Sequence, residues 1–400
     1  MSHKSIKWLP AVVVPAVIAV GVIAVPLQAG AAVDLPDKTA QQVLLMVSDS
    51  TVTAFSGTVE KTANLSLPAI DLGAEMSGQA GKQGASGSGD AASGALSSVL
   101  ELLSGSHTAR VYVDGSAADG SVTDGSTDGP AKVRVQIQDR MAERNIVSNG
   151  SDAWLYDSET DTAAHLAIPA GAAASMKDKM AALDAEAPAD VSTPSQLADR
   201  FLSEIDPSTV VTVGTDGRVA GRTVYELVLT PKATDTLVES VSISVDSETG
   251  MPLQVSVRAA GQKDPAFQVG FSSVDYGAPS ADLFDFTPPA GATVKELALP
   301  QTPANHAAPD VAAPDTARPE IPTEGLPVVT GTGWDAIVEI PAASVPPELG
   351  DNPLMSEVAT KVDGGRLLST SLVNVFLADD GRFFAGSVPV DQLQAAASAQ

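Results

Sequence analysis

Cysteine is absent from this chain of 400 residues. Its absence excludes disulfides, thiolate nucleophiles, zinc–thiolate sites and cysteine-ligated iron–sulfur clusters, and it also excludes a lipid anchor on an N-terminal cysteine. The fold must therefore be held together by burial alone. Hydrophobic residues make up 44% of the chain, which is enough for a sizeable core.

Basic and aromatic residues are scarce as well. Lys and Arg number 23 against 49 Asp and Glu, so the formal net charge is −26, and aromatic residues make up only 4%. Nucleic acid is a poor partner for such a surface, because phosphate backbones bind through Lys and Arg. Most of the surface would also repel anionic lipid headgroups. A lipid would therefore have to bind locally or place its acyl chain in a cavity, and solubility after secretion is the simpler explanation of the charge.

Motifs that carry catalysis are missing too. The sequence has no G-x-S-x-G elbow, no phosphate-binding loop and no dinucleotide fingerprint, and no serine stands beside a recognisable base and orienting acid. The four histidines lack the spacing of metal ligands, and His165 is expected at the surface or edge of a strand. They are His3, His107, His165 and His306. We therefore expect no enzyme, no metal and no cofactor.

A run of Asp-Gly pairs suggests calcium at first sight. The aspartates are Asp114, Asp119, Asp124 and Asp128. An EF-hand loop needs acids two residues apart and a Glu at its end, and this run has neither. Flexible Asp-Gly turns are therefore the preferred interpretation.

Residues 1–33 have the pattern of a secretory signal segment. Lys4 and Lys7 give a positive start, an apolar stretch follows, and Ala29-Gly30-Ala31 is a small-x-small cleavage site. The alternative is an uncleaved anchor, because the apolar stretch is long enough to span a bilayer. Its three prolines weaken a continuous helix and favour cleavage. Under both interpretations the chain after Asp34 lies outside the cytoplasm, either secreted or in the cell envelope.

The rest of the chain is predicted to form mainly short strands. A helix is expected over residues 37–54, and a second one starts at Thr193, followed by Pro194 at the first helical position. Alternating segments separated by turns predict consecutive strands, and hence an antiparallel sheet. Asn149-Gly150 and Asp216-Gly217 mark two of these turns. The segments are 55–67, 110–114, 132–138, 144–148, 153–156, 163–168, 210–213, 222–230, 237–246, 252–259 and 267–275.

Two stretches of small residues interrupt this pattern. Residues 71–95 are mostly Gly, Ser and Ala and are predicted to be a flexible insertion. The Leu-rich helix predicted over 96–103 packs on the core or, in a sharper interpretation, forms a flap that touches lipid or a partner. Residues 298–327 are rich in Pro and Ala and are predicted to be a linker.

Residues 328–400 are predicted to be a separate small unit. A strand is expected over 334–340, and a hairpin joins 367–377 to 382–388 through Asp379-Asp380-Gly381. These elements are too few to fold securely alone, so we expect the unit to dock on the main sheet.

Four segments within residues 37–297 form an ordered set of motifs. They are F-S-G-T-V at 55–59, V-S-N-G-S-D-A-W-L-Y-D at 147–157, Y-E-L-V-L-T-P-K at 225–232 and F-D-F-T-P-P-A-G-A-T-V at 284–294. Together they resemble the first strand, hairpin, strand end and closing motif of the LolA family of lipoprotein carriers. They are also similar to the related RseB sensors and the mycobacterial envelope lipid carriers. The extended form resembles versions typical of actinobacteria, and residues 71–107 and 298–400 lie outside the resemblance.

The resemblance implies a mainly β fold of the α+β class. Residues 34–297 would form a curved antiparallel sheet or half-open β-barrel that wraps helices, with a C-terminal extension. In the family, the cavity between sheet and helices takes acyl chains, which need apolar surface and no catalytic group. The candidate lining residues are the side chains of the strands that are expected to point inward. For each of them, a place in a solid core is about as good an interpretation as a place in the cavity wall. They are Val111, Val113, Val133, Val135, Ile137, Trp154, Tyr156, Val224 and Val228.

One position departs from the family's pattern. Lipoprotein carriers of this family typically place an Arg just before a Pro near the second strand, where it latches the helical lid. Here Gly129 precedes Pro130, and Arg134 lies within a strand. A free lipid, a glycolipid or a signalling role therefore stands beside lipoprotein as an alternative.

Three functions are compatible with the sequence. The first is a carrier of lipid or acylated protein, which predicts a cavity and lipid that co-purifies with the chain. The second is an RseB-like envelope-stress sensor that binds a membrane protein partner. The third is a secreted scaffold without a ligand, and a hydrolase is least supported because no nucleophile–base pair is visible.

Overall fold

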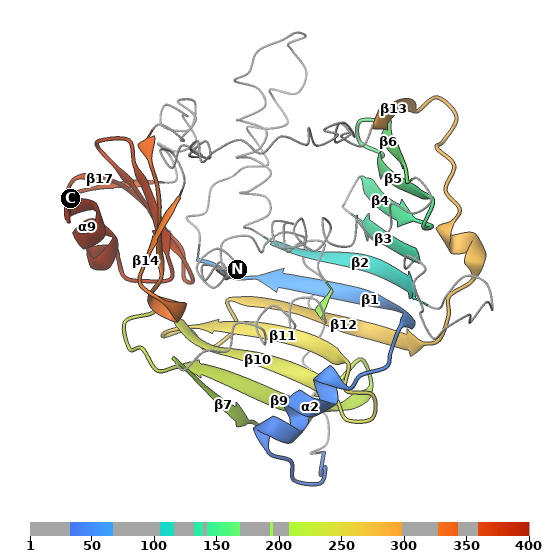
Figure 1. Ribbon diagram of the computed structural model, residues 1–400, viewed down its shortest axis with the longest axis horizontal. Helices are drawn as coiled ribbons and strands as arrows, with labels where there is room; N and C mark the ends of the chain where they lie inside the picture. Colours follow the sequence, from blue (N-terminus) through green and yellow to red (C-terminus); the bar gives the residue numbers. More distant parts are fainter. Residues whose placement is uncertain are drawn as a thin grey trace, which may run out of the picture.

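The computed structural model describes residues 33–66, 105–115, 132–138, 142–168, 193–194, 208–297, 327–342 and 359–399. In these residues the chain forms a large curved sheet, a smaller second sheet and two α-helices (Figure 1). The predicted signal segment, the insertion over 71–95, the Leu-rich helix and nearly all of the linker lie outside the described residues. So does the helix predicted from Thr193, apart from its first two residues.

The main sheet has 13 strands in the order β13-β6-β5-β4-β3-β2-β1-β12-β11-β10-β9-β7, with β8 also paired to β9. Neighbouring strands are antiparallel except β13, which runs parallel to β6. The strands are β1 (Ala54–Ala63), β2 (Gly105–Asp114), β3 (Lys132–Gln138), β4 (Glu143–Ser148), β5 (Asp152–Asp157), β6 (Thr162–Ala167), β7 (Thr209–Val213), β8 (Gly217–Val219), β9 (Arg222–Pro231), β10 (Val238–Asp246), β11 (Pro252–Ala259), β12 (Phe267–Tyr276) and β13 (Thr293–Leu297). The predicted mainly β class is confirmed, and the sheet is curved, mixed and open.

One predicted turn is confirmed and another is wrong in position. Between β4 and β5, Gly150 has a φ of 97°, and the side-chain oxygen of Asn149 accepts hydrogen bonds from the N–H groups of Ser151 and Asp152. The turn expected at Asp216-Gly217 lies instead at residues 220–221, between β8 and β9. Both residues there have positive φ, which matches the right-handed twist of a tight hairpin.

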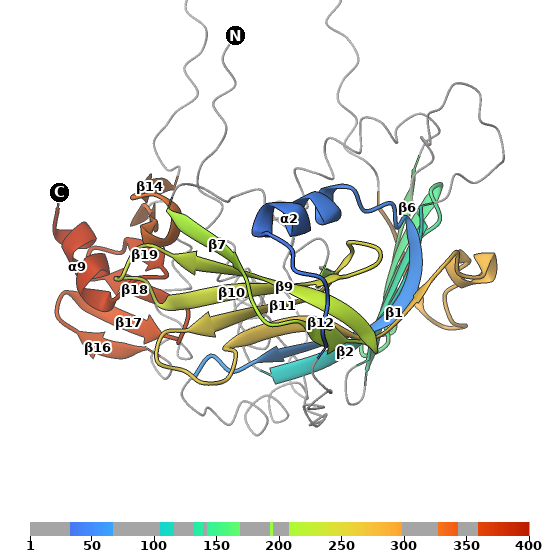
Figure 2. The same ribbon diagram turned by 90° about the horizontal axis from the view of Figure 1, so that it is seen from below.

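In strands β1 to β5 the registers place most apolar residues on one face of the main sheet and most polar residues on the other. One row across five strands contains Gly57, Val111, Val135, Ile146 and Leu155. The row beside it, which points to the other face, contains Thr58, Arg110, Gln136, Asn145 and Tyr156. The sheet curves toward its apolar face, so this face is concave (Figure 2).

Helix α2 (Ala40–Ser48) lies on the concave face, over β7 and β9 (Figure 2). It begins at Thr39, whose side chain and that of Gln42 form a capping box. Val43 points into the sheet and is fully buried in the main core. The helix predicted over 37–54 is thus confirmed but shorter, since β1 already begins at Ala54.

The chain after β12 crosses the convex face. The 3₁₀ helix η2 (Ala281–Phe284) packs on β3, and Phe284 is buried there. A guanidinium N–H of Arg134 donates a hydrogen bond to the carbonyl oxygen of Leu283 at 2.9 Å. Arg134 therefore ties this convex segment down and does not face the concave side.

The second sheet has the order β14-β15-β19-β18-β17-β16. Its elements are β14 (Val328–Thr330), the 3₁₀ helix η3 (Gly333–Asp335), β15 (Ile337–Ile340), β16 (Thr360–Val362), β17 (Gly365–Ser369), β18 (Asn374–Ala378), β19 (Phe383–Gly386) and helix α9 (Val390–Ser398). The hairpin β18–β19 is confirmed, but the strand predicted over 367–377 is two strands. The Thr370 hydroxyl accepts hydrogen bonds from the N–H groups of Leu372 and Val373, which turns the chain there.

The C-terminal unit packs across one end of the main sheet (Figure 1). Leu372 and Val373 belong to the main core. The N–H of Ser371 donates to the carbonyl oxygen of Leu65 beyond β1 at 2.9 Å, and the Trp334 indole N–H donates to Thr209 of β7 at 2.9 Å. Leu65 lies shortly after the last residue of β1, Thr209 is the first residue of β7, and both lie at the same end of the main sheet. The C-terminal unit therefore packs against this end of the sheet.

In the part of the chain that the structure describes, no helix combines the length and the hydropathy needed to cross a bilayer.

Candidate ligand-binding face

Five of the nine predicted lining residues lie together on the concave face. Val113 pairs with Val133 and Val111 with Val135 across β2 and β3. Val111, Val135 and Ile137 are buried, whereas Val113 and Val133 are only partly buried against the same core. The concave face thus combines packed core with accessible apolar surface.

Trp154 and Tyr156 lie on the convex face, which corrects the expectation that they share a surface with the valines. Leu155, between them, takes the inward position opposite Ile146. The two rings lie under Phe286, at 5.7 Å and 5.9 Å between centroids. The hairpin motif and the closing motif therefore meet in one aromatic cluster that fastens the convex segment to β5.

Val224 and Val228 also lie on the face opposite to the predicted one. Along β9, the residues that pair with the apolar row of β10 are Tyr225, Leu227 and Leu229. These three are buried in the main core. Val224 is buried too, and Val228 is partly buried, but both alternate away from the concave side.

Two exposed leucines that were not predicted lie at the rim of the concave face. Leu155 is 50% exposed and Leu297 is 53% exposed. Leu155 pairs with Ala164 of β6, and Leu297 pairs with Leu166 of the same strand, so both point to the concave side. The concave apolar surface therefore continues to the open edge of the sheet.

Lys61 and His107 bring polar atoms to the same face near the C-terminal unit. They lie directly opposite each other in β1 and β2 and are buried. The Lys61 ammonium lies 5.8 Å from the centre of the Phe267 ring. His107 is thus a strand residue of the concave face.

A second histidine, His165, lies between two carboxylates on the convex side. Its Nε2 is 2.9 Å from Asp152 Oδ1, and its Nδ1 is 2.8 Å from Glu296 Oε2. The hydrogen bonds to Asp152 and then Glu296 raise the pKa of His165, and burial opposes them. The pKa of Asp152 is lowered, first by Ser151 and then by His165. No group of three His, Asp or Glu among the described residues suits a metal ion.

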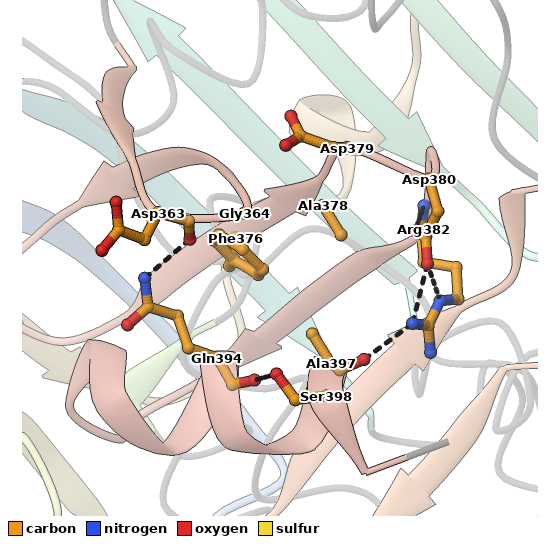
Figure 3. A pocket seen from close by; sticks show the side chains of 10 residues that line it. All are labelled: Asp363, Gly364, Phe376, Ala378, Asp379, Asp380, Arg382, Gln394, Ala397 and Ser398. Atoms are coloured by element: carbon orange, nitrogen blue, oxygen red, sulfur yellow. Dashed lines mark hydrogen bonds and ion pairs between the residues drawn. The ribbon is translucent and has the colours of Figure 1, made fainter.

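The C-terminal unit carries a pocket of about 290 Å³ between the turns of its sheet and helix α9 (Figure 3). Phe376, Ala378 and Ala397 give it apolar walls. Its rim carries the carboxylates of Asp363, Asp379 and Asp380 and the guanidinium of Arg382. Arg382 is bonded to Asp380, Glu339 and the carbonyl oxygen of Ala397, so its charge is already compensated.

The fold and its two faces define a mainly β protein built on a curved, open sheet. Residues 110–297, from β2 to the end of β13, match the model of DUF2092, a family described as a predicted periplasmic protein. No curated protein matches the chain.

Solved structures to which the chain is similar include a chain of the MucA/MucB complex of Pseudomonas aeruginosa. Their identity is 15% and the TM-score is 0.40, with 90% of this chain and 96% of that chain covered. A LolA superfamily protein from Nitrosomonas europaea is 10% identical with a TM-score of 0.21, over 62% of this chain and 99% of that chain. A MucB chain and a LolA superfamily protein are thus both among the solved structures to which the chain is similar.

Proposed function

We propose that this protein binds the acyl chains of a lipid or lipoprotein outside the cytoplasm, on the concave face of the main sheet, without catalysing a reaction. The observation that carries the proposal is the separation of the two faces. Apolar rows run along the concave side from Val111 to the exposed Leu155, whereas the convex rows carry residues such as Arg110 and Gln136. Leu155 and Leu297 extend this apolar surface to the rim, where an acyl chain on the concave face would contact them.

The energetics favour such a site. Each methylene removed from water contributes about 0.8 kcal/mol, so about twelve of them contribute roughly 10 kcal/mol before the cost of ordering the ligand. No reactive side chain is needed for this gain. The family description of residues 110–297 as a predicted periplasmic protein supports a location outside the cytoplasm.

The test compares two carboxylates introduced at similar exposure on opposite faces. Leu155→Asp places a charge on the concave rim, and Val294→Asp places one on the convex side, where Val294 is 44% exposed. We expect Leu155→Asp to weaken binding of a fluorescent fatty acid about tenfold, which corresponds to about 1.4 kcal/mol. Val294→Asp should bind like the unaltered chain. Native mass spectrometry of the secreted protein should also detect bound lipid.

Equal binding by both variants would contradict the assignment of the concave face. A chain that carries no lipid and binds no fatty acid would contradict the function itself.

A second candidate function is recognition of a membrane protein partner, as in an RseB-like regulator. The acid-rimmed pocket of the C-terminal unit, with Asp363 and Asp379 around the Phe376 wall, favours it. A basic segment of a partner would suit this pocket, because its charge would meet the carboxylates of Asp363 and Asp379. Co-purification of a membrane protein in place of lipid would favour this second function.

A further inference from the structure

Strand β13 is a short, exposed strand at the edge of the main sheet. It has five residues, all of them exposed, and it lies at the edge of the sheet, paired parallel to β6. The convex segment that contains η2 leads into it, and the C-terminal unit follows it in the chain (Figure 1). A short exposed edge strand of this kind opens easily, because little apolar surface is buried beneath it.

His165 joins this strand to the two strands beside it. It stands on β6, between Asp152 of β5 and Glu296 of β13, with both ring nitrogens in contact with a carboxylate oxygen. Its ring also stacks on Trp154, with the ring centres 4.1 Å apart. A protonated imidazole donates to both carboxylates at once, whereas a neutral imidazole has a single N–H to donate.

We propose that His165 is a pH-responsive clasp, which holds β13 on the edge of the main sheet when it is protonated and loosens when it loses its proton. The clasp stands independently of the proposed ligand. Its consequence for the ligand face rests on the proposed function, because Leu297 of β13 forms part of the concave rim.

The groups around His165 determine the sign of the effect. Asp152 and Glu296 face it from the two neighbouring strands, and Trp154 and the Phe286 segment add uncharged rings. Lys295 of β13 pairs beside Ala164 and so lies on the concave side. The pKa of His165 is raised in the folded chain, so its contribution is complete below the ordinary value of 6.5 and is lost as the pH rises through the folded value.

The test follows β13 by hydrogen exchange in the full chain at acidic and mildly alkaline pH, corrected for the chemical exchange rate. We expect residues 293–297 to open about threefold more often at the higher pH, since partly exposed ion pairs make modest contributions. Glu296→Gln should remove this dependence. Glu248→Gln is the matched control, because Glu248 is 75% exposed in a 2.7 Å ion pair and Glu296 is 71% exposed in a 2.8 Å pair.

A second measurement reads the histidine directly. In a chain with Trp8→Phe and Trp334→Phe, emission comes from Trp154 alone, and a protonated imidazole stacked on an indole quenches it. The midpoint of quenching should lie above that of an exposed histidine, and Glu296→Gln should lower it. Opening of β13 that is independent of pH, or a midpoint unchanged by Glu296→Gln, would overturn the proposal. Loss of fatty-acid binding alone would leave both readouts intact and would contradict only the proposed function.

Discussion

Asp246 shows how a single buried charge is stabilised in this chain. Its side chain is fully buried, and it accepts hydrogen bonds from Arg222, from the Tyr276 hydroxyl and from the N–H groups of Glu248 and Thr249. Burial alone would raise the pKa of Asp246, but these donors outweigh burial and lower it. Burial also raises the pKa of Tyr276 to about 12, so its hydroxyl stays a donor at physiological pH.

Removing the cation of this cluster should destabilise the fold. We expect Arg222→Met to lower the free energy of unfolding by about 3 kcal/mol, because it leaves a buried carboxylate without its counter-charge. Because Asp246 has a lowered pKa, its stabilisation is present at neutral pH and lost as the pH falls through the folded value. The difference in the free energy of unfolding between the variant and the unaltered chain should therefore be largest at neutral pH and shrink as the pH falls, which urea unfolding followed by circular dichroism at a series of pH values measures.

Arg218→Met is the control for this change. Arg218 is exposed on β8 and makes one long hydrogen bond, to the carbonyl oxygen of Gly221. A change within about 0.5 kcal/mol is expected there. If the two variants unfold alike, the Arg222–Asp246 pair is not an important source of stability.

At the scale of single elements, helix α2 depends on one glycine of the sheet. Gly250, in the turn between β10 and β11, has a φ of 74°, and a Cβ there would lie 2.0 Å from the carbonyl oxygen of Met46. The last turn of α2 therefore rests on backbone that has no room for a side chain.

Gly250→Ala should push the end of α2 off the concave face. The expected loss is about 3 kcal/mol, of which about 1 kcal/mol comes from the positive φ and the rest from the contact with Met46. Gly261→Ala isolates the backbone contribution, because Gly261 has a φ of 80° and open space around it. Urea unfolding gives the free energies, and faster proteolysis within residues 40–48 reports the helix. If Gly250→Ala and Gly261→Ala lowered the free energy of unfolding equally, the close contact with the Met46 carbonyl oxygen would make no contribution of its own.

Alternation predicted most strands but could not assign their faces. The clean pattern over 132–138 placed Val133, Val135 and Ile137 on one face, as the register does, because only one side of that strand is apolar. In β5 and β9 both sides carry apolar residues, so Trp154 and Val224 were placed on the concave side by mistake. The missing information was the pairing register between neighbouring strands, because the register decides which face of the sheet each side chain takes. Strands that pair can be far apart in the sequence, so local alternation does not contain the register.

The elements that were missed lack a local pattern. Strand β13 reads Thr-Val-Lys-Glu-Leu, shows no alternation, and finds its partner β6 about 130 residues earlier in the chain. Helix α9 is rich in Ala and buries only Leu393 fully, so its periodicity is faint. In both cases the structure is decided by long-range strand pairing or packing. The intrinsic helix and strand propensities of the residues give no information about these distant contacts.

At the scale of the whole molecule, the C-terminal unit shares a core with the main sheet. Leu372 is 2% exposed and lies in the main core, although it comes from the C-terminal unit. We expect Leu372→Asp to undock the unit, because a carboxylate cannot be buried there without a partner. Undocking should shift the emission of Trp334 to the red, since its indole leaves Thr209 for water.

Val328→Asp is the control, because Val328 is 50% exposed on β14 of the same unit. It should leave the Trp334 emission unchanged. An unshifted emission in Leu372→Asp would mean that the two units are joined by other contacts.

The position of the C-terminal unit affects how a ligand could lie on the concave face. Because the unit packs against the strand ends near Leu65 and Thr209, an elongated ligand that lies along the strands would have one end against the unit and the other end pointing away from it. An acyl chain would then lie with its tail toward the unit and its polar headgroup toward the opposite strand ends. A partner that delivers or receives such a ligand would approach the protein from the side away from the C-terminal unit.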